Sequence, residues 1–365
     1  MTKVLLVSGR GIQRTVADCC AQDFEDCILD AARATLFLAE EGKPAPTGDY
    51  DLVIVVGLNF RKMATTYRLA GMPQGRHTVA YVFGGYGSHT TRYRDPVKRL
   101  LNPRYRAMTK LDKVYVGIPD AVEKIQKDLA LPVSFLPMAA DVLGVQAQPF
   151  ETQKDRPVSV AGFGRLHSGI SAAICDRLNR PGSEHLYLNN SVGGNTEPSD
   201  KPRYRATFWH TLRKTQISLA FDHFFANEKN TAEHSYVGPR WFESLAAGTV
   251  IAGVAPEYES RKSLLDWEDA TIDLSADPET AADEIDALLA DPERLHRASR
   301  LNLINMNRRH DWRHRLAEIY SDLGLTMDAP FKVSLDLLAR RADQIAAGAE
   351  AAEPAKTEEE DSFIS

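Results

Sequence analysis

Uninterrupted apolar runs alternate with amphipathic stretches in the first half of the sequence. Because these runs contain no regular polar positions, they are typical of parallel strands that helices cover on both faces. We expect strands over residues 3–8, 52–56, 78–83, 113–116 and 133–136, and a helix over 12–20. Strands that alternate with helices predict a doubly wound α/β domain, which we place at residues 1–145.

A second series of apolar runs follows a polar, proline-containing stretch at residues 146–156. We expect its strands over 158–164, 184–188, 217–221, 249–254 and 270–274. The pattern predicts a second α/β domain over residues 157–325, followed by a helix over 326–345. Residues 346–365 hold few large apolar groups and cannot offset the entropy lost on ordering, so we expect a disordered acidic tail there.

The length of 365 residues fits two cores of ordinary size with a cleft between them. The net charge of −6 arises in the tail, where residues 350–361 hold six acidic residues and one lysine. The body is therefore nearly neutral, which argues against a nucleic-acid-binding protein. The longest apolar run, 52–58, is too short to cross a bilayer, and residues 1–9 lack a secretory segment, so we expect a cytoplasmic protein.

Metal and disulfide sites are not expected. The four cysteines form no C-x-x-C pair and no cluster with histidine at the spacing of zinc ligands. His310 and His314 lie one helical turn apart, but no third ligand is recognisable near them. The sequence therefore predicts neither a bound metal nor a resident cofactor.

The most informative stretch covers residues 236–253. Pro239 suits the first position of a helix and Gly248 suits the left-handed residue just past its end, so Arg240 and Glu243 share a face in the first turns. Near the positive end of the helix dipole, Arg240 is suited to hold a diphosphate and Glu243 to accept hydrogen bonds from two ribose hydroxyls. The alternative is an ion pair between positions i and i+3 on a solvated helix.

Two glycine-rich loops follow predicted strands of the first domain. Gly9 and Gly11 come after the first strand, and Gly84 and Gly85 come after the strand at 78–83. Ligands of open α/β sheets bind at the carboxyl ends of the strands, so we expect these four glycines to line the cleft. The first loop lacks the third glycine of the dinucleotide fingerprint, which disfavours a nicotinamide-dependent oxidoreductase.

The second glycine loop also supplies a candidate general base. His89 follows Gly85 closely and would lie at the mouth of the cleft, within reach of an acceptor hydroxyl. Asp95 and Tyr86 are rivals for the same role, and a polar loop residue without a role is the plainer reading of His89.

Five segments resemble, in the same order, motifs of one enzyme family. They are Asp112-Lys-Val-Tyr-Val-Gly117 with Leu131-Pro-Val-Ser-Phe-Leu-Pro-Met-Ala-Ala-Asp141, Val160-Ala-Gly-Phe-Gly-Arg-Leu166, Phe208-Trp-His-Thr-Leu-Arg-Lys-Thr-Gln-Ile-Ser-Leu-Ala220, Arg240-Trp-Phe-Glu-Ser-Leu-Ala-Ala-Gly248 and His310-Asp-Trp-Arg-His-Arg-Leu316. The family is that of the GT-B fold glycosyltransferases of the retaining family 4 type, with the related spore-maturation-protein-like group of glycosyl transferases group 1.

The resemblance implies a fold, a reaction and a set of partners. The fold would be GT-B, in which two Rossmann-like domains with parallel sheets face an inter-domain cleft. The reaction would transfer a sugar from a nucleoside-diphosphate-sugar to an acceptor hydroxyl with retention of configuration, without a metal and with no cofactor beyond that co-substrate. The first domain would bind the acceptor, whether a glycan, a lipid-linked molecule or a small molecule, and the second would bind the donor.

Carried over residue by residue, the resemblance implies that Glu243 binds the donor ribose. Donor-binding positions near the diphosphate would be Gly164, Arg165, Gly238 and Arg240. The chain departs from the family twice.

The first glutamate of the family's Glu-x7-Glu motif falls on Ser235, and a lysine after the Gly-Arg-Leu segment is replaced by His167-Ser168-Gly169. We expect Glu233 to act in place of the missing glutamate, with His234 and His223 as alternatives.

Two alternatives bear on function. Because the first glutamate is missing, a catalytically silent GT-B scaffold that binds a nucleotide sugar or a glycan is the second hypothesis. Residues 92–110 hold seven basic residues and one acid, which suits a phosphorylated acceptor or a peripheral contact with the inner face of a membrane, or else a solvated basic helix.

Overall fold

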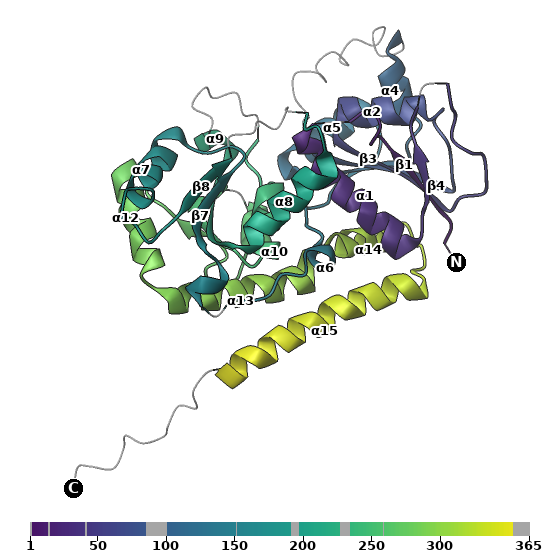
Figure 1. Cartoon of the computed structure of the whole chain (residues 1–365). Coiled ribbons are helices and arrows are strands. Elements are labelled where there is room, and N and C mark those ends of the chain that lie inside the picture. The colour runs from purple at the N-terminus through teal and green to yellow at the C-terminus, as the bar shows by residue number, and fades with distance from the viewer. Residues whose placement is uncertain are drawn as a thin grey trace.

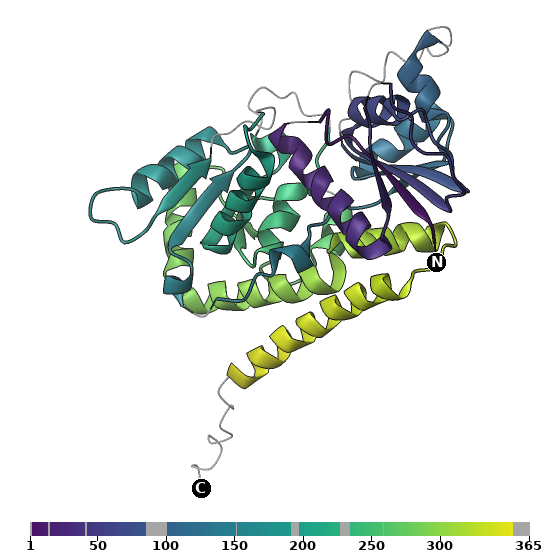
Figure 2. The same ribbon diagram turned by 45° about the vertical axis from the view of Figure 1, so that its right-hand side comes forward.

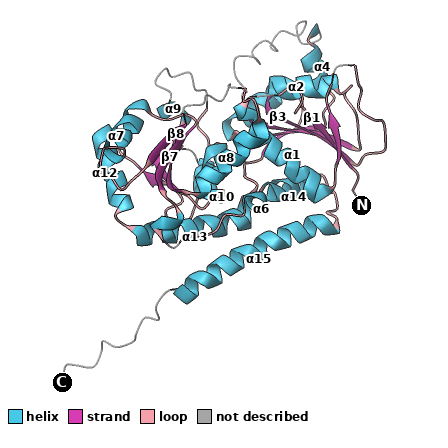
Figure 3. Ribbon diagram, viewed as in Figure 1, coloured by secondary structure: helices cyan, strands magenta, loops and turns pink. Residues whose placement is uncertain are grey.

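Two parallel sheets organise the chain (Figure 1). The computed structural model describes residues 2–13, 15–40, 42–84, 101–150, 152–190, 197–226, 234–257 and 259–352. In these ranges the predicted α/β class with two parallel sheets is confirmed, and helices cover both faces of each sheet (Figure 3).

The first lobe is built on a six-stranded sheet in the order β2-β1-β3-β4-β5-β6, with every pair parallel. Its strands are β1 (Val4–Ser8), β2 (Thr35–Leu38), β3 (Leu52–Asn59), β4 (His77–Gly84), β5 (Lys113–Val116) and β6 (Val133–Phe135). The helices of this lobe are α1 (Cys19–Ala32), α2 (Phe60–Leu69), α4 (Pro103–Met108) and α5 (Val122–Leu129).

Alternate residues of the central strands enter two separate cores. In β3, Ile54 and Val56 belong to the core that α1 covers, while Val53 and Val55 belong to the core that α2 and α5 cover. All four side chains are fully buried. This double burial explains why the strand reads as a continuous apolar run.

The second lobe is built on a five-stranded parallel sheet in the order β11-β10-β9-β7-β8. Its strands are β7 (Val158–Phe163), β8 (Tyr187–Asn190), β9 (Thr215–Phe221), β10 (Val250–Val254) and β11 (Ile272–Asp273). Its helices are α7 (Ser168–Leu178), α8 (Lys201–Arg213), α9 (His223–Ala226), α10 (Pro239–Ala246), α11 (Glu259–Leu264), α12 (Pro278–Leu289) and α13 (Pro292–Arg309).

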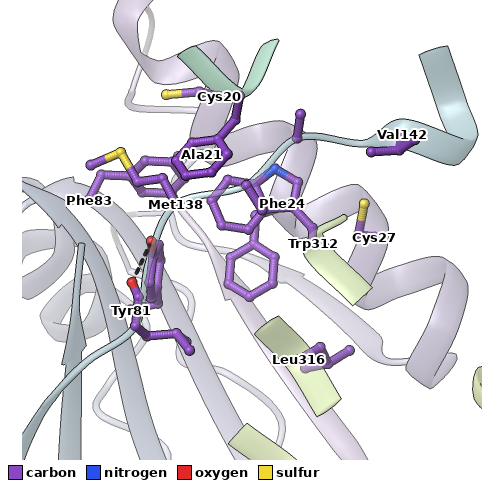
Figure 4. Packing of buried hydrophobic residues seen from close by; sticks show 14 of the residues in the cluster. Cys20, Ala21, Phe24, Cys27, Tyr81, Phe83, Met138, Val142, Trp312 and Leu316 are labelled. Carbon is purple, nitrogen blue, oxygen red and sulfur yellow. Dashed lines mark hydrogen bonds between the residues drawn. The ribbon is translucent and has the colours of Figure 1, made fainter. Parts of the chain in front are cut away.

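The end of the chain returns to the first lobe. After α13, helix α14 (Trp312–Asp322) packs against α1. Figure 4 shows Trp312 against Phe24, with centroids 4.7 Å apart, and near Tyr81 and Phe83 of β4. The expected second domain over 157–325 assigns this helix to the other lobe, because periodicity identifies an amphipathic helix but not the sheet that it covers.

The last helix, α15 (Ala329–Ala352), runs along α13 beneath both lobes, as both views show (Figures 1 and 2). It extends past the predicted end at 345, so the expectation of disorder from residue 346 is wrong as far as Ala352. The remaining tail, residues 353–365, lies outside the described residues. None of the described helices is both long and apolar enough to span a membrane.

Two further elements differ from the sequence prediction. The helix expected over 12–20 begins only at Cys19, because residues 9–13 form a turn and a short 3-10 segment (Val16–Asp18) precedes α1. Strand β2 is not predicted: it is an edge strand of only four residues, Thr-Leu-Phe-Leu, and its apolar side chains are largely exposed. The linker between the lobes contains the short helix α6 (Val142–Val145).

Candidate functional site

Helix α10 begins at the junction between the lobes. Gly238 is its N-cap residue, Pro239 occupies the first helical position, and Gly248 adopts a φ of +68° just beyond the end, as the sequence predicts. Tyr236, just ahead of the helix, reaches the carboxyl end of β4, since a β-carbon added at Gly84 would lie 3.8 Å from its hydroxyl. The N-terminus of α10 therefore faces the first lobe.

Glu243 lies one turn inside this helix and is only 3% exposed. Its Oε1 accepts a hydrogen bond from Nη2 of Arg205 at 2.5 Å, and Nη1 of Arg240 lies 3.3 Å from its Oε2. Arg205, on α8, also donates from Nε to Oδ2 of Asp23 on α1, at 3.0 Å. Asp23, Arg205, Arg240 and Glu243 thus form an interlobe charge cluster.

This cluster modifies the expectation for Glu243. The residue does lie where the lobes meet, but its carboxylate is enclosed by two guanidinium groups instead of facing an open crevice. Sequence reasoning missed Arg205 and Asp23 altogether. No local signal marks them, because the two residues are separated by 182 positions and meet only through the packing of α8 against α1 (Figure 1).

The pKa values of the two carboxylates in the cluster are shifted in opposite directions. Burial raises the pKa of Glu243, but the charges of Arg205 and Arg240 outweigh burial and hold that pKa below its usual value. Burial raises the pKa of Asp23 to about 6, against the opposing effect of Arg205 and with a further increase from Glu243. Glu243 is therefore the firmly ionised partner, and Asp23 is the one that titrates close to neutral pH.

Arg240 spans from α10 to the loop after β7. Its guanidinium stacks on Phe208 at 4.6 Å and on Phe163 at 5.6 Å. Nη1 is buried and has no hydrogen-bond acceptor in the described part of the chain, since Oε2 of Glu243 is near but outside hydrogen-bond geometry. Burial lowers the pKa of Arg240, although Glu243 opposes this effect. A buried guanidinium donor without an acceptor is costly and suits an anionic ligand.

The loop after β7 approaches Arg240 and starts α7. Gly164 adopts a φ of +77°, and a β-carbon there would lie 3.5 Å from Nη2 of Arg240. Arg165 is exposed. His167 caps α7 by accepting a hydrogen bond from the backbone N–H of Ile170 at 3.3 Å. The positive end of the α7 dipole and two arginines therefore converge on one region, which favours a negatively charged ligand.

A carboxylate that the sequence analysis did not single out lies at the end of β9. Asp222 is 7% exposed, and its Oδ1 accepts a hydrogen bond from the hydroxyl of Ser235 at 2.8 Å. Its Oδ2 accepts from the backbone N–H of Phe224 at 3.1 Å. Ser235 is the position where the family has its first glutamate, so the structure brings a different carboxylate to that residue. The available signal was an aspartate directly after an apolar strand.

Comparison with known proteins agrees with this geometry. Residues 177–321 match the family model described as glycosyl transferase-like. The matched segment runs from the end of α7 to α14 and contains Arg240 and Glu243, and the arrangement of two parallel sheets is that of the GT-B fold. No curated protein matches the sequence.

Two solved structures share the fold. The Anabaena protein HepE, solved in complex with UDP-glucose, aligns with a TM-score of 0.54 and 11% identity over 89% of this chain and 100% of its own. An alpha-glucosyltransferase, solved in complex with UDP-glucose and DNA containing an abasic site, aligns with a TM-score of 0.52 and 10% identity over 88% and 98%. At this identity the likeness shows the fold alone.

The glycines that follow β1 have different surroundings. Gly9 has no room for a side chain, because a β-carbon would lie 2.3 Å from Nε2 of Gln13. At Gly11 a β-carbon would meet nothing within 4 Å. Arg10, between them, turns away from the junction and pairs with Glu25 at 2.6 Å. Of the two glycines, only Gly11 has space around its α-carbon.

Several predicted site residues lie outside the described residues. His89 and Gly85, with the rivals Tyr86 and Asp95, fall in 85–100, and Glu233 falls in 227–233. Their assignments stay predictions.

The two histidines offered as alternatives are described. Burial lowers the pKa of His223, and Arg165 lowers it further. Nε2 of His234 is buried without a hydrogen-bond partner among the described groups. Within the described ranges no three His, Cys, Asp or Glu side chains are grouped as in a metal site.

Proposed function

We propose that this glycosyltransferase binds a nucleoside-diphosphate-sugar against α10 and the β7–α7 loop and transfers the sugar to an acceptor hydroxyl held by the first lobe. The observation that carries the proposal is the buried Nη1 of Arg240, which lies 3.3 Å from Oε2 of Glu243 but has no hydrogen-bond acceptor among the described residues. A diphosphate oxygen would supply that acceptor. Glu243, one turn away, would accept from the ribose hydroxyls after rearrangement of its arginine partners.

The same arrangement can assist departure of the leaving group. Arg165, Arg240 and the N-terminus of α7 would stabilise the charge that develops on the diphosphate, so the proposal needs no metal ion. Asp222, fixed by Ser235, would accept hydrogen bonds from hydroxyls of the transferred sugar. Retention of configuration follows from the family resemblance, and His89 remains the proposed base for the acceptor.

UDP-glucose is the first donor to test, because both GT-B structures aligned above were solved with it. A thermal-shift screen against UDP-, GDP-, ADP- and TDP-sugars identifies the base, since a ligand that binds only the native state raises the melting temperature. We expect a nucleotide-sugar to raise the melting temperature of the wild type. If none of the four classes raises the melting temperature, the proposal is contradicted.

Substitution of Arg240 tests the site itself. Arg240→Met keeps the apolar stem that packs on the aromatic rings and removes the donor, so we expect the dissociation constant of the donor to rise about tenfold to a hundredfold. Arg294→Met is the matched control, because Arg294 also pairs with a carboxylate, Asp269, at 2.8 Å but lies elsewhere in the second lobe. An unchanged donor affinity in Arg240→Met removes the diphosphate assignment.

The missing glutamate keeps one alternative open. With serine at position 235, a scaffold would bind the nucleotide sugar and leave it intact. Release of free nucleoside diphosphate over time, measured with and without acceptor candidates, separates the two functions. We expect slow hydrolysis of the donor even without acceptor. If the donor stays intact at saturating protein, the scaffold is favoured.

A further inference from the structure

Arg205 is shared between carboxylates of different lobes. It contacts Asp23 through both Nε and Nη2, and it contacts Glu243 through Nη2 alone. Its guanidinium also lies against the rings of Phe208, at 4.8 Å, and Trp209, at 4.6 Å. These contacts leave only 15% of its side chain exposed, so the position of Arg205 is set by the two carboxylates that compete for it.

Access to Glu243 depends on this competition. The residue is 3% exposed and each of its oxygens faces a guanidinium, so a ribose diol can reach it only if an arginine shares or yields its place. A carboxylate has about four lone-pair positions, but a tightly held arginine occupies the side from which a ligand would approach. The strength with which Arg205 holds Glu243 therefore sets the affinity for the donor.

We propose that Arg205 is a positioning residue of the donor site and that Asp23 of the first lobe controls it, by drawing the guanidinium toward α1 and so keeping Glu243 available to the ribose. The inference rests on the function proposed above. Its basis is geometric: Arg205 donates to Oδ2 of Asp23 from both Nε and Nη2, whereas its contact with Glu243 uses Nη2 alone.

The proposal links the position of the lobes to donor binding. Lys201, one turn before Arg205 on α8, donates to the backbone carbonyl of Gln13 at 2.9 Å, so the start of α8 is attached to the first lobe at two points. Separation of the lobes withdraws Asp23 and leaves Glu243 as the carboxylate partner of Arg205. In the open arrangement Arg205 then pairs with Glu243 alone, whereas in the closed arrangement Asp23 shares Arg205 and weakens its hold on Glu243.

The test is a double-mutant cycle on the affinity for UDP-glucose, or for the nucleotide-sugar that the screen selects, measured by calorimetry. Asp23→Asn should raise the dissociation constant about tenfold, which corresponds to ~1.4 kcal/mol. In an Arg205→Gln background the same change should have less than about a threefold effect. An equal effect of Asp23→Asn in both backgrounds, or none in either, overturns the proposal.

Two controls keep the result specific. Asp26→Asn removes a neighbouring carboxylate of α1 that is 57% exposed and pairs with Arg10, and it should leave donor affinity unchanged. If Arg205→Gln does not fold, Arg205→Lys replaces it in the cycle, because lysine keeps the charge but cannot contact two carboxylates through a fork. The effect of Asp23→Asn should again shrink, and an undiminished effect counts against the proposal.

A measurement without donor separates failure of this inference from failure of the proposed function. Asp23→Asn and Glu243→Gln should destabilise the apoprotein non-additively in thermal unfolding, because they share Arg205. Additive effects mean that Arg205 is not shared, and they overturn the inference whatever the ligand. If the effects are non-additive but the protein binds no nucleotide-sugar, Arg205 is shared as inferred. The proposed function is then contradicted.

Discussion

The two lobes meet at two junctions that differ in chemistry. At the hinge side, Trp312 of α14 is buried against an aromatic group of the first lobe, and Arg313 beside it donates to Asp30 and Asp141 at 2.9 Å each. At the cleft side, the interlobe charge cluster contains two carboxylates and two guanidiniums.

This difference indicates two roles. Aromatic packing at the hinge loses contacts steeply when its surfaces separate, so it fixes one arrangement of α14 on the first sheet. The charge cluster offers alternative pairings, because Arg205 contacts both Asp23 and Glu243. We infer that the hinge junction stabilises the fold and that the cleft junction adjusts to the ligand.

The largest expected effect is that of Trp312→Ala. The side chain is 1% exposed, and its removal leaves a cavity between α14 and the first sheet, so we expect a loss of about 3–5 kcal/mol in the free energy of unfolding. Chemical denaturation measures this loss. Trp312→Phe should lose distinctly less, and equal losses for both variants would mean that packing volume does not stabilise the hinge.

Glu243→Gln should act mainly on the ligand. A charged acceptor is worth about 1.5–3 kcal/mol in a hydrogen bond, so donor affinity should fall about tenfold to a hundredfold. The matched control is Glu40→Gln, which removes a carboxylate from an exposed pair with Lys43 at 2.8 Å. Calorimetry should find the control indistinguishable from the wild type, and a comparable loss in the control would show that the effect is not local.

The pH dependence tests the cleft junction. The pKa of Asp23 is raised to about 6, so the folded state binds this proton more tightly than the unfolded chain does. The stability from this group is therefore present in mild acid and lost as the pH rises through about 6.

Donor affinity should change in the opposite sense. Below about pH 6 a neutral Asp23 releases Arg205 to Glu243, so affinity should fall as the pH drops through that value, by about tenfold at most. The charged groups that bear on Asp23 are Arg205, Glu243 and Asp141. Calorimetry between pH 5 and pH 8 measures the profile, and Asp23→Asn should flatten it. If the change in donor affinity near pH 6 persists in Asp23→Asn, a group other than Asp23 causes it.

The smallest effects concern the first glycine loop. Gly9→Ala would push aside the hydrogen bond from Gln13 to Thr66, which measures 2.9 Å, and should cost about 1 kcal/mol of stability. Gly11→Ala meets nothing within 4 Å and should stay within about 0.5 kcal/mol of the wild type. Thermal unfolding of the two variants compares them directly, and equal destabilisation would contradict the described turn.

Much of the fold follows from the sequence because buried parallel strands leave uninterrupted apolar runs. Pro239 and Gly248 mark the ends of α10 through their backbone preferences alone. The return of α14 to the first lobe was not predictable, since an amphipathic helix fits either sheet. Strand β2 was missed because its run of large apolar residues is only three residues long, Leu36 to Leu38, and too short to indicate a strand.

The site was less predictable than the fold. Motif resemblance singled out Arg240 and Glu243, and the structure brings them together at the lobe junction. It could not reveal what covers Glu243, because Arg205 contacts Glu243 and Asp23 only through tertiary packing. Asp222 was not singled out, since its partner Ser235 lies 13 positions away in the sequence.

The most direct test of the central claim is amide hydrogen exchange of the wild type with and without a saturating nucleotide-sugar, UDP-glucose first. The account predicts slower exchange at residues 164–170, where the β7–α7 loop starts its helix, and at residues 238–243 at the start of α10. Binding that leaves both segments unprotected, while another part of the second lobe becomes protected, would contradict the assignment of Arg240 and Glu243 to the donor.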